Sequence, residues 1–310
     1  MSKPFMTYEQ QIEKLCKKGL IIESTAYAQA VLARNSYFAL IVGYKDLFKN
    51  PTTGNYRDGT RLQDIVSLYR FDEDLRALTL RYLLHIERHI KSSLSYAFCA
   101  EFGDSQTAYL DSKNYNGTDF KAVNKLINKY LSPLLDRPTD YPYIEHHKAK
   151  HKNVPLWVLS SALSFGTVSI MYKCAKPQVQ SSISKEFPQL NERQLEQILQ
   201  VLTNFRNVCA HGDRLFSYRC AKQDIPDLPL HAKLHIPQKG THYLMGKRDY
   251  FAVVLALRYM LPNEEFLAYK QQLSLLIDRA AKHNTQMQRS ELLRHMGLPE
   301  NWAMITRYKR

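Results

Sequence analysis

The sequence has few of the residues that build disulfide-linked, metal-bound or membrane-spanning proteins. Its five cysteines are widely separated and form no C-x-x-C pair, which excludes a disulfide framework and the common zinc and redox motifs. Only 11 glycines occur in 310 residues, which excludes collagen-like and low-complexity chains. The strongest apolar run, residues 251–261, is short and contains Arg258, and the first residues lack a signal-peptide pattern. We therefore expect a globular cytoplasmic protein with no membrane span, metal or cofactor.

Acidic residues are also scarce relative to basic ones. The chain has 43 lysines and arginines against 29 aspartates and glutamates, so its formal net charge is +14. Such an excess raises the local concentration of polyanions, which makes nucleic acid the first partner to consider and an acidic membrane surface the second. Charge alone is a weak indicator, because many proteins carry a solvated basic face.

Strand-like alternation is scarce too, whereas apolar residues recur at spacings of three and four. The sequence therefore predicts an all-α fold, with Thr7 as the N-cap of the first helix. Residues 103–154, interrupted by prolines and glycines, are expected to form short helices and loops, including a basic loop at 145–152. The longer helices are expected at 7–20, 24–48, 62–102 (one helix or two), 155 onward with a break near 166, 191–211, 247–261, 263–283 and 288–296.

The most informative candidate residues lie at the end of the predicted helix 191–211. Arg206 and His211, with Asn207 between them, fit the R-x(4–6)-H pattern that is typical of HEPN ribonucleases. Roughly two such matches are expected by chance in this sequence, so the surrounding helix decides the value of the pattern. Gly212 stands where a left-handed C-cap is expected, which places His211 at a helix C-terminus. Partial negative charge there favours the imidazolium form.

The geometry of a helix separates the two motif residues. On an ideal helix Arg206 and His211 lie about 140° apart, so one helix does not bring them together. Two copies of this helix across a two-fold interface would place both pairs around one phosphate, which makes a homodimer or a larger homo-oligomer the expected unit. Arg206 borders the apolar stripe and needs a counter-ion, for which Glu87 is the candidate. Lys91, one turn after Glu87, would support it, although an ordinary surface ion pair is the simpler interpretation.

Other candidates are less specific. Four basic residues are possible RNA contacts: Lys148, Lys150, Lys152 and Arg214. Three histidines accompany the lysines but lack the carboxylate or cysteine spacing of a metal site: His146, His147 and His151. Arg289 and His295 repeat the R-x(4–6)-H spacing, which we interpret as coincidence. Tyr82 and Trp157 are expected in the core, the latter at the start of a helix.

Five blocks of sequence occur along the chain in order, over roughly residues 3–218. They are Lys3-Pro4 with Gly19-Leu20-Ile21-Ile22; Asn35-Ser36-Tyr37-Phe38 with Gly43-Tyr44; Leu68-Tyr69-Arg70-Phe71-Asp72 with Leu75-Arg76 and Ile86-Glu87; Pro155-Leu156-Trp157 with Leu163-Ser164-Phe165-Gly166; and the motif 206–211 with Arg214-Leu215. Together they resemble the Abi-like family of bacterial abortive-infection proteins, of the AbiD/AbiF type. The segment 297–302 resembles an ending seen in some members.

The resemblance implies an HEPN-like helical bundle with additional helices at both ends. Residues 1–220 would form the family domain, with N-terminal helices in 1–58 and core helices in 60–102 and 155–212. Residues 221–310 would form a C-terminal helical extension. The resemblance also implies a phage-defence or toxin-type endoribonuclease, which in some relatives is held in check by a small noncoding RNA antitoxin.

HEPN enzymes use the RNA 2′-hydroxyl as an internal nucleophile, without metal, and leave 2′,3′-cyclic phosphate and 5′-hydroxyl ends. In that scheme Arg206 stabilises the scissile phosphate and His211 transfers protons. Asn207 orients the phosphate or the histidine, and Glu87 holds Arg206 in place. DNA, which lacks the 2′-hydroxyl, is not expected to be cut. Because Gly212 stands where the family usually carries a second histidine, a non-catalytic HEPN module that binds RNA or dimerises remains the alternative.

Overall fold

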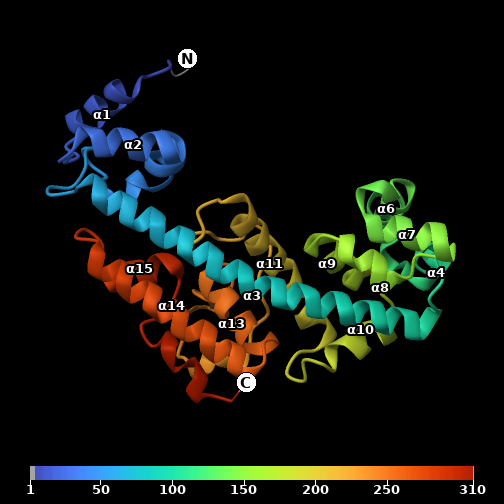
Figure 1. Ribbon diagram of the computed structural model, residues 1–310. Coiled ribbons are helices and arrows are strands. Elements are labelled where there is room, and N and C mark those ends of the chain that lie inside the picture. Colours follow the sequence, from blue (N-terminus) through green and yellow to red (C-terminus); the bar gives the residue numbers. More distant parts are fainter. Residues whose placement is uncertain (1–3, 310) are drawn as a thin grey trace.

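A computed structural model describes residues 4–309, so Lys3 of the first block lies outside the described residues. Figure 1 shows helices along the whole chain. In the described part, the one sheet is a hairpin in which β1 (Gln238–Lys239) pairs antiparallel with β2 (His242–Tyr243). The predicted all-α fold is confirmed.

One long helix, α3 (Leu62–Phe102), runs through the molecule (Figure 1). Its 41 residues contain no glycine or proline, and Gly103, at φ +86°, ends it. At a rise of about 1.5 Å per residue the helix is roughly 60 Å long. Five apolar residues at spacings of three and four along this helix are all buried: Leu75, Leu78, Tyr82, Ile86 and Ile90. Residues 62–102 therefore form one helix rather than two.

Helices from the second half of the chain cover this spine. Those in contact with α3 are α8 (Leu156–Leu159), α9 (Phe165–Cys174), α10 (Pro177–Ser184), α11 (Glu192–His211) and α14 (Asn263–His283). Helix α13 (Tyr250–Met260) packs against α11 and α14 and is buried at every position, which accounts for the apolar run in the sequence. No helix within residues 4–309 is long and apolar enough to cross a membrane.

A chain of hydroxyl groups links three of these helices inside the core. The Tyr250 hydroxyl on α13 lies 2.7 Å from Thr79 Oγ1 on α3 and 2.8 Å from the Tyr269 hydroxyl on α14. Because buried hydroxyls are costly to leave unpaired, these contacts favour one arrangement of the three helices. The C-terminal helices are thus fixed to the spine by polar as well as apolar contacts.

The N-terminal region is less regular than its sequence predicts. Helix α1 (Tyr8–Lys17) begins at the predicted cap, where Thr7 and Gln10 form a capping box. The predicted helix 24–48, however, is wrong beyond its first half. It divides into α2 (Thr25–Asn35), a π-helical turn η1 (Phe38–Val42) and a 3-10 turn η2 (Lys45–Phe48). Ser36, at φ +57°, interrupts the helix because this conformation cannot continue it.

Residues 103–154 form the expected short elements. They are α4 (Gln106–Leu110), η3 (Ser112–Asn114), η4 (Gly117–Asp119), α5 (Phe120–Lys125), η5 (Leu126–Leu131), α6 (Ser132–Asp136), η6 (Pro138–Asp140) and α7 (Pro142–His151). The predicted basic loop at 145–152 is wrong, since most of it belongs to α7. Pro142 at the first turn favours helix initiation there, and Lys152 ends the helix in a left-handed conformation.

The helix expected from residue 155 is also shorter than predicted. Helix α8 and the 3-10 turn η7 (Ser160–Ala162) precede the break, which falls before Ser164 and not at Gly166. Ser164 caps α9 by accepting a hydrogen bond from the Thr167 amide. The prediction that Trp157 is a core residue is wrong: it is 50% exposed. In this short helix Leu156 and Leu159 take the buried positions, so Trp157 faces outward.

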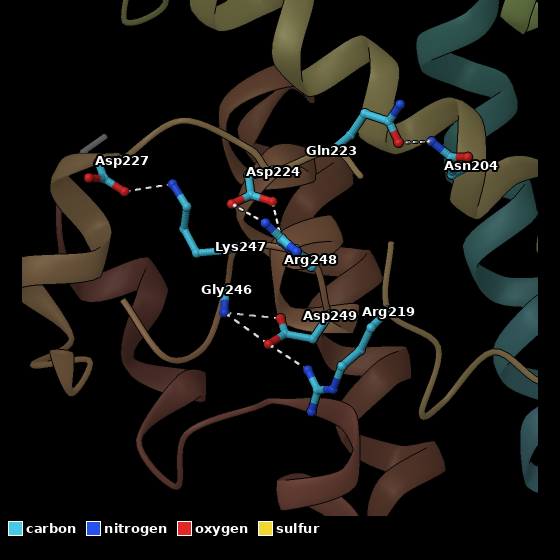
Figure 2. Close-up of polar contacts among 9 residues, drawn as sticks. All are labelled: Asn204, Arg219, Gln223, Asp224, Asp227, Gly246, Lys247, Arg248 and Asp249. Atoms are coloured by element: carbon cyan, nitrogen blue, oxygen red, sulfur yellow. Dashed lines mark hydrogen bonds and ion pairs between the residues drawn. The ribbon is translucent and has the colours of Figure 1, made fainter. Parts of the chain in front are cut away.

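Beyond α11 the chain forms a connector and then the predicted C-terminal helices. Helices α13 and α14 lie at their expected places, followed by α15 (Arg289–Met296) and the 3-10 turn η8 (Trp302–Arg307). Helix α10, the β-hairpin and a short helix α12 (Pro229–Lys233) were not predicted. The connector is fastened by polar contacts that Figure 2 shows. They join Asn204 to Gln223, Arg219 to Asp249, Lys247 to Asp227, and Arg248 to Asp224.

Candidate active site

Helix α11 carries the predicted motif at its C-terminal end. Asn191 and Gln194 form a capping box at its start, and Gly212, at φ +73°, closes it in the predicted left-handed conformation. The apolar stripe is buried: Leu195, Ile198, Leu199, Leu202, Phe205 and Cys209. Burial of this face leaves Asn207 and His211, which are four residues apart, on the solvent side of the last turns.

Arg206 lies at the edge of that buried face and contacts α3. Its Nε atom is 3.4 Å from Glu87 Oε2, and the Lys91 Nζ atom is 2.9 Å from Glu87 Oε1. The Glu87 side chain is only 6% exposed, against 27% for Arg206 and 16% for Lys91. The contact expected between Glu87 and Arg206 is therefore present. The Glu87–Lys91 pair is also largely shielded from solvent, unlike an ordinary surface pair.

The contact between Arg206 and Glu87 is ionic rather than an aligned hydrogen bond. Arg206 Nε and Glu87 Oε2 are both inaccessible to solvent, and at 3.4 Å neither completes a hydrogen bond with the other. The Nη groups of Arg206 form no hydrogen bond with another residue of 4–309, so they can contact an anion while Glu87 holds the guanidinium. Glu87 thus fixes the position of a cation that retains hydrogen-bonding capacity.

His211 and Asn207 lack polar partners in the described part of the chain. Both side chains are exposed, and neither forms a hydrogen bond or ion pair with another residue of 4–309. Their polar atoms are consequently available to a ligand. Within one chain Arg206 points to α3 whereas His211 stands at the helix end, so the structure does not join the two motif residues by contact.

A buried carboxylate fixes the segment that follows the motif. Asp72 on α3 accepts hydrogen bonds from the backbone amides of Leu215 (2.9 Å) and Phe216 (2.7 Å) and from the Tyr44 hydroxyl (2.7 Å). Burial and the nearby carboxylate raise the pKa of Tyr44, which keeps its hydroxyl protonated as a donor. Arg76 completes the set, with Nη1 2.8 Å from Asp72 Oδ2.

Two arginines extend this anchor to the end of α11. Arg76 Nη1 also donates to the Asp213 carbonyl at 3.2 Å, and Arg214 donates to the Gly43 carbonyl. Arg214, a predicted RNA contact, therefore has a structural partner, although the residue is exposed. Because Asp213 meets Arg76 while Arg206 meets Glu87, α11 runs antiparallel to α3.

The predicted basic contacts lie elsewhere in the structure. Lys148, Lys150 and Lys152 belong to α7 and its C-terminus, near the far end of α3 from the motif (Figure 1). Lys148 donates to the Leu135 carbonyl at 2.7 Å, so its ammonium group already has a partner. The structure therefore does not bring these lysines together with Arg206 and His211.

The histidines beside those lysines pack on one another without forming a metal site. The ring centroids of His146, His147 and His151 lie 5.2–5.9 Å apart. No group of three or more histidine, cysteine, aspartate or glutamate side chains within residues 4–309 is arranged to hold a metal ion. The second motif match is engaged in structural pairs, with Arg289 bound to Asp278.

Comparison with known proteins decides the family. The model of the family described as Abi-like protein matches residues 30–217, which is more than half of the chain and includes α3, α11 and the Asp72 anchor. The chain belongs to the Abi-like family. No curated protein and no solved structure matches it.

Three sequence blocks of this Abi-like chain that are far apart in the sequence lie together in the fold. The Tyr44, Asp72–Arg76 and Leu215 blocks meet at the Asp72 carboxylate. Sequence reasoning gave these residues no role. The available indication was a pair of opposite charges, four residues apart, within an apolar stripe, which is typical of a buried ion pair. Their arrangement sets the position of the motif at the end of α11.

Proposed function

We propose that this Abi-like chain is an HEPN-type endoribonuclease that acts without metal in defence against phage. The observation that carries the proposal is the contrast on the last turns of α11: Arg206 is held by Glu87, while Asn207 and His211 are exposed without polar partners. A positioned guanidinium can stabilise charge on a phosphate, and an exposed imidazole can transfer protons. Family membership supports an abortive-infection role.

The proposed reaction is an internal transesterification of RNA. The 2′-oxygen attacks the adjacent phosphorus and loses its proton, while the bond from phosphorus to the 5′-oxygen breaks and that oxygen gains a proton. The products are a 2′,3′-cyclic phosphate and a 5′-hydroxyl. Arg206 would stabilise the negative charge that develops on the phosphate, His211 would transfer a proton, and Asn207 would orient the phosphate.

The proposed site requires two copies of the chain. Arg206 is turned toward α3 and His211 stands at the end of α11, and no contact joins them within one chain. A two-fold axis beside the last turns of α11 would bring the Arg206 of one copy close to the His211 of the other. We therefore propose a homodimer as the catalytic unit, with further association possible through other faces.

The net charge of +14 suits RNA both as substrate and as regulator. A small noncoding RNA could occupy the basic surface and hold the toxin inactive, as the family resemblance implies. In that arrangement the regulator would compete with substrate, so it would be recovered bound to the purified protein.

The chemistry is tested by the ends of the cleaved strand. Purified protein is incubated in EDTA with single-stranded RNA and, separately, with DNA of the same sequence. The expected result is cleavage of RNA alone, with new 5′ ends that polynucleotide kinase labels without prior phosphatase treatment. Cleavage of DNA, a requirement for metal, or 5′-phosphate ends would contradict the proposal.

One observation favours a second function, a non-catalytic module that binds RNA or dimerises. Arg206 contacts Glu87 on α3 and makes no contact with His211 within one chain, so the two motif residues do not form a site there. The family resemblance also implies a further histidine where this chain has Gly212. Such a module would retain RNA without cutting it. RNA that stays intact over hours with excess protein, while binding depends on Arg206, would establish this alternative.

A further inference from the structure

A groove opens beside the candidate site, between α3 and the α8–η7 segment. Its volume is about 610 Å³, within the range of about 300–1,000 Å³ that ligand sites occupy. The lining consists of Arg88, Lys91, Tyr96, Trp157 and four serines, and includes no acidic residue. The groove is therefore basic and aromatic, a composition that suits an anion with flat apolar parts.

The two aromatic side chains of the groove are unusually exposed. Tyr96 is 77% exposed and Trp157 is 50% exposed, although rings of this size are normally largely buried. Tyr96 lies on α3 eight residues after Arg88 and five after Lys91, and all three side chains line the groove. Trp157 lines it from α8. Exposed rings next to cations are the arrangement that stacks on unpaired bases and holds the phosphates between them.

One residue connects the groove to the motif. Lys91 lines the groove and also pairs with Glu87, which in turn holds Arg206. Since α11 runs antiparallel to α3, the groove lies on the side of Arg206 that is away from His211. A strand whose scissile phosphate meets Arg206 could therefore continue directly along residues 88–96 of α3.

We propose that this groove binds unpaired nucleotides of an RNA strand next to the cleavage site. Tyr96 and Trp157 stack on bases, and Arg88 and Lys91 contact the phosphates that flank them. Sequence-tolerant stacking would favour single-stranded over duplex RNA, because paired bases cannot offer their faces. The inference rests on the proposed function in taking RNA as the ligand, and it adds where the strand lies.

Trp157 supplies the readout for a test. The chain has two tryptophans, and Trp302 is fully buried, so a strand in the groove should quench the fluorescence of Trp157 alone. The probe is a single-stranded decamer of 2′-O-methyl RNA, which cannot be cleaved because its 2′-oxygens are blocked. Titration with wild-type protein should give saturable quenching, and Trp157→Phe should abolish it while anisotropy of a labelled decamer still reports binding.

Variants then separate the groove from the rest of the surface. Tyr96→Ala and Trp157→Ala are each expected to weaken decamer binding about 5- to 100-fold, the range that loss of one stacked base implies. Phe38→Ala is the matched control, because Phe38 is also 77% exposed but lies on η1. Binding by both groove variants that equals wild type would overturn the inference. So would a loss of dimers in sedimentation with unchanged RNA binding, which would make the groove an interface between copies.

The same experiment distinguishes this inference from the proposed function. Decamer binding that depends on Tyr96 and Trp157, with no cleavage of unmodified RNA, would reject the nuclease and retain the groove. Cleavage of unmodified RNA with decamer binding unaffected by the groove variants would retain the nuclease and reject the groove.

Discussion

At the scale of single residues, Glu87 lies between two cations from different helices. Lys91 is its neighbour on α3 and Arg206 reaches it from α11, at 2.9 Å and 3.4 Å. The carboxylate is more buried than either partner. Its negative charge is therefore balanced mainly by the two cations and only slightly by solvent. Its loss would leave two cations facing each other at the base of the candidate site.

Replacement of this carboxylate tests its role in positioning. Glu87→Gln is expected to lower the free energy of unfolding by about 1–3 kcal/mol, less than for a fully buried pair because both cations are partly exposed. It should also lower kcat for RNA cleavage at least tenfold with a smaller change in KM, since Arg206 would no longer be held. Urea denaturation and single-turnover kinetics measure the two effects.

Glu186→Gln is the matched control for that substitution. Glu186 pairs with His89, two residues from Glu87 on the same helix, but the pair is about 42% exposed. Little effect on stability or cleavage is expected, as for most exposed pairs. If both variants cleave RNA like the wild type, Glu87 has no positioning role.

Sequence reasoning reached part of this site for a physical reason. The burial of Arg206 beside an apolar stripe follows from helical periodicity, and a buried cation needs a counter-ion, so the Glu87 contact could be predicted. The Asp72–Arg76 pair had an indication in the sequence, but its attachment to the segment after α11 had none, because Leu215 and Phe216 contribute backbone amides, which every residue except proline carries. The groove at Trp157 was missed because aromatic residues at helix starts are more often core.

At the scale of elements, two helices end in the same way but in different surroundings. Gly212 ends α11 and Gly297 ends α15, both at φ +73° and ψ +18°. A Cβ atom at Gly212 would meet nothing within 4 Å, whereas one at Gly297 would lie 2.4 Å from Asp249 Cγ. Asp249 is itself held by Arg219 and the Gly246 amide (Figure 2), so its displacement would break these hydrogen bonds and cost free energy.

This pair of glycines separates backbone strain from steric overlap. Gly212→Ala is expected to cost about 1 kcal/mol, the penalty of a left-handed conformation for a side-chain-bearing residue. Gly297→Ala should cost about 3 kcal/mol or more, because displacement of Asp249 is added. Thermal and urea unfolding compare the two variants, and equal losses would contradict the close packing of α15 against the connector.

Asp249 also gives the fold a pH dependence. Burial raises the pKa of Asp249 to about 6, although Arg219 and backbone amides partly offset the effect. Because the folded state holds this proton more tightly than the unfolded chain, the stability it contributes is complete below about pH 4 and is lost as the pH rises through 6. The difference between the pKa values of Asp249 in the folded and unfolded states corresponds to about 3 kcal/mol.

The substitution Asp249→Asn removes this titration. Relative to wild type, the variant is expected to gain about 2–3 kcal/mol of stability between pH 4 and pH 7, whatever its constant offset from changed hydrogen bonds. Urea denaturation of both proteins at the two pH values gives the difference. A constant difference across this range would mean that Asp249 titrates alike in the folded and unfolded states.

At the scale of the whole molecule, the periodicity of apolar residues predicted the long helices but not the short ones. The segments 62–102, 191–211 and 263–283 carry sustained apolar stripes, so their bounds could be predicted. The segment 36–48 could not, because Ser36 lies at φ +57°, a conformation that residues with a side chain rarely adopt and that propensity does not indicate. Likewise, the packing of α13 and α14 against α11 and α3 is a long-range outcome that local patterns do not contain.

Assembly of the molecule into dimers is tested by mixing inactive chains. If the site combines Arg206 of one copy with His211 of the other, equimolar Arg206→Ala and His211→Ala proteins should regain cleavage after subunit exchange. A heterodimer then contains one intact Arg206–His211 pair across its interface. Mixtures that form heterodimers and stay inactive would place both residues of a working site on the same chain.

The central claim is that Arg206 and His211 cut RNA without metal. The measurement is the rate of cleavage of single-stranded RNA in EDTA by Arg206→Ala and His211→Ala, with the exposed residues Arg193 on α11 and His242 on β2 substituted by alanine as controls. The account predicts a loss of at least about 100-fold in each motif variant and wild-type rates in both controls. Motif variants that cleave as fast as the controls would contradict it.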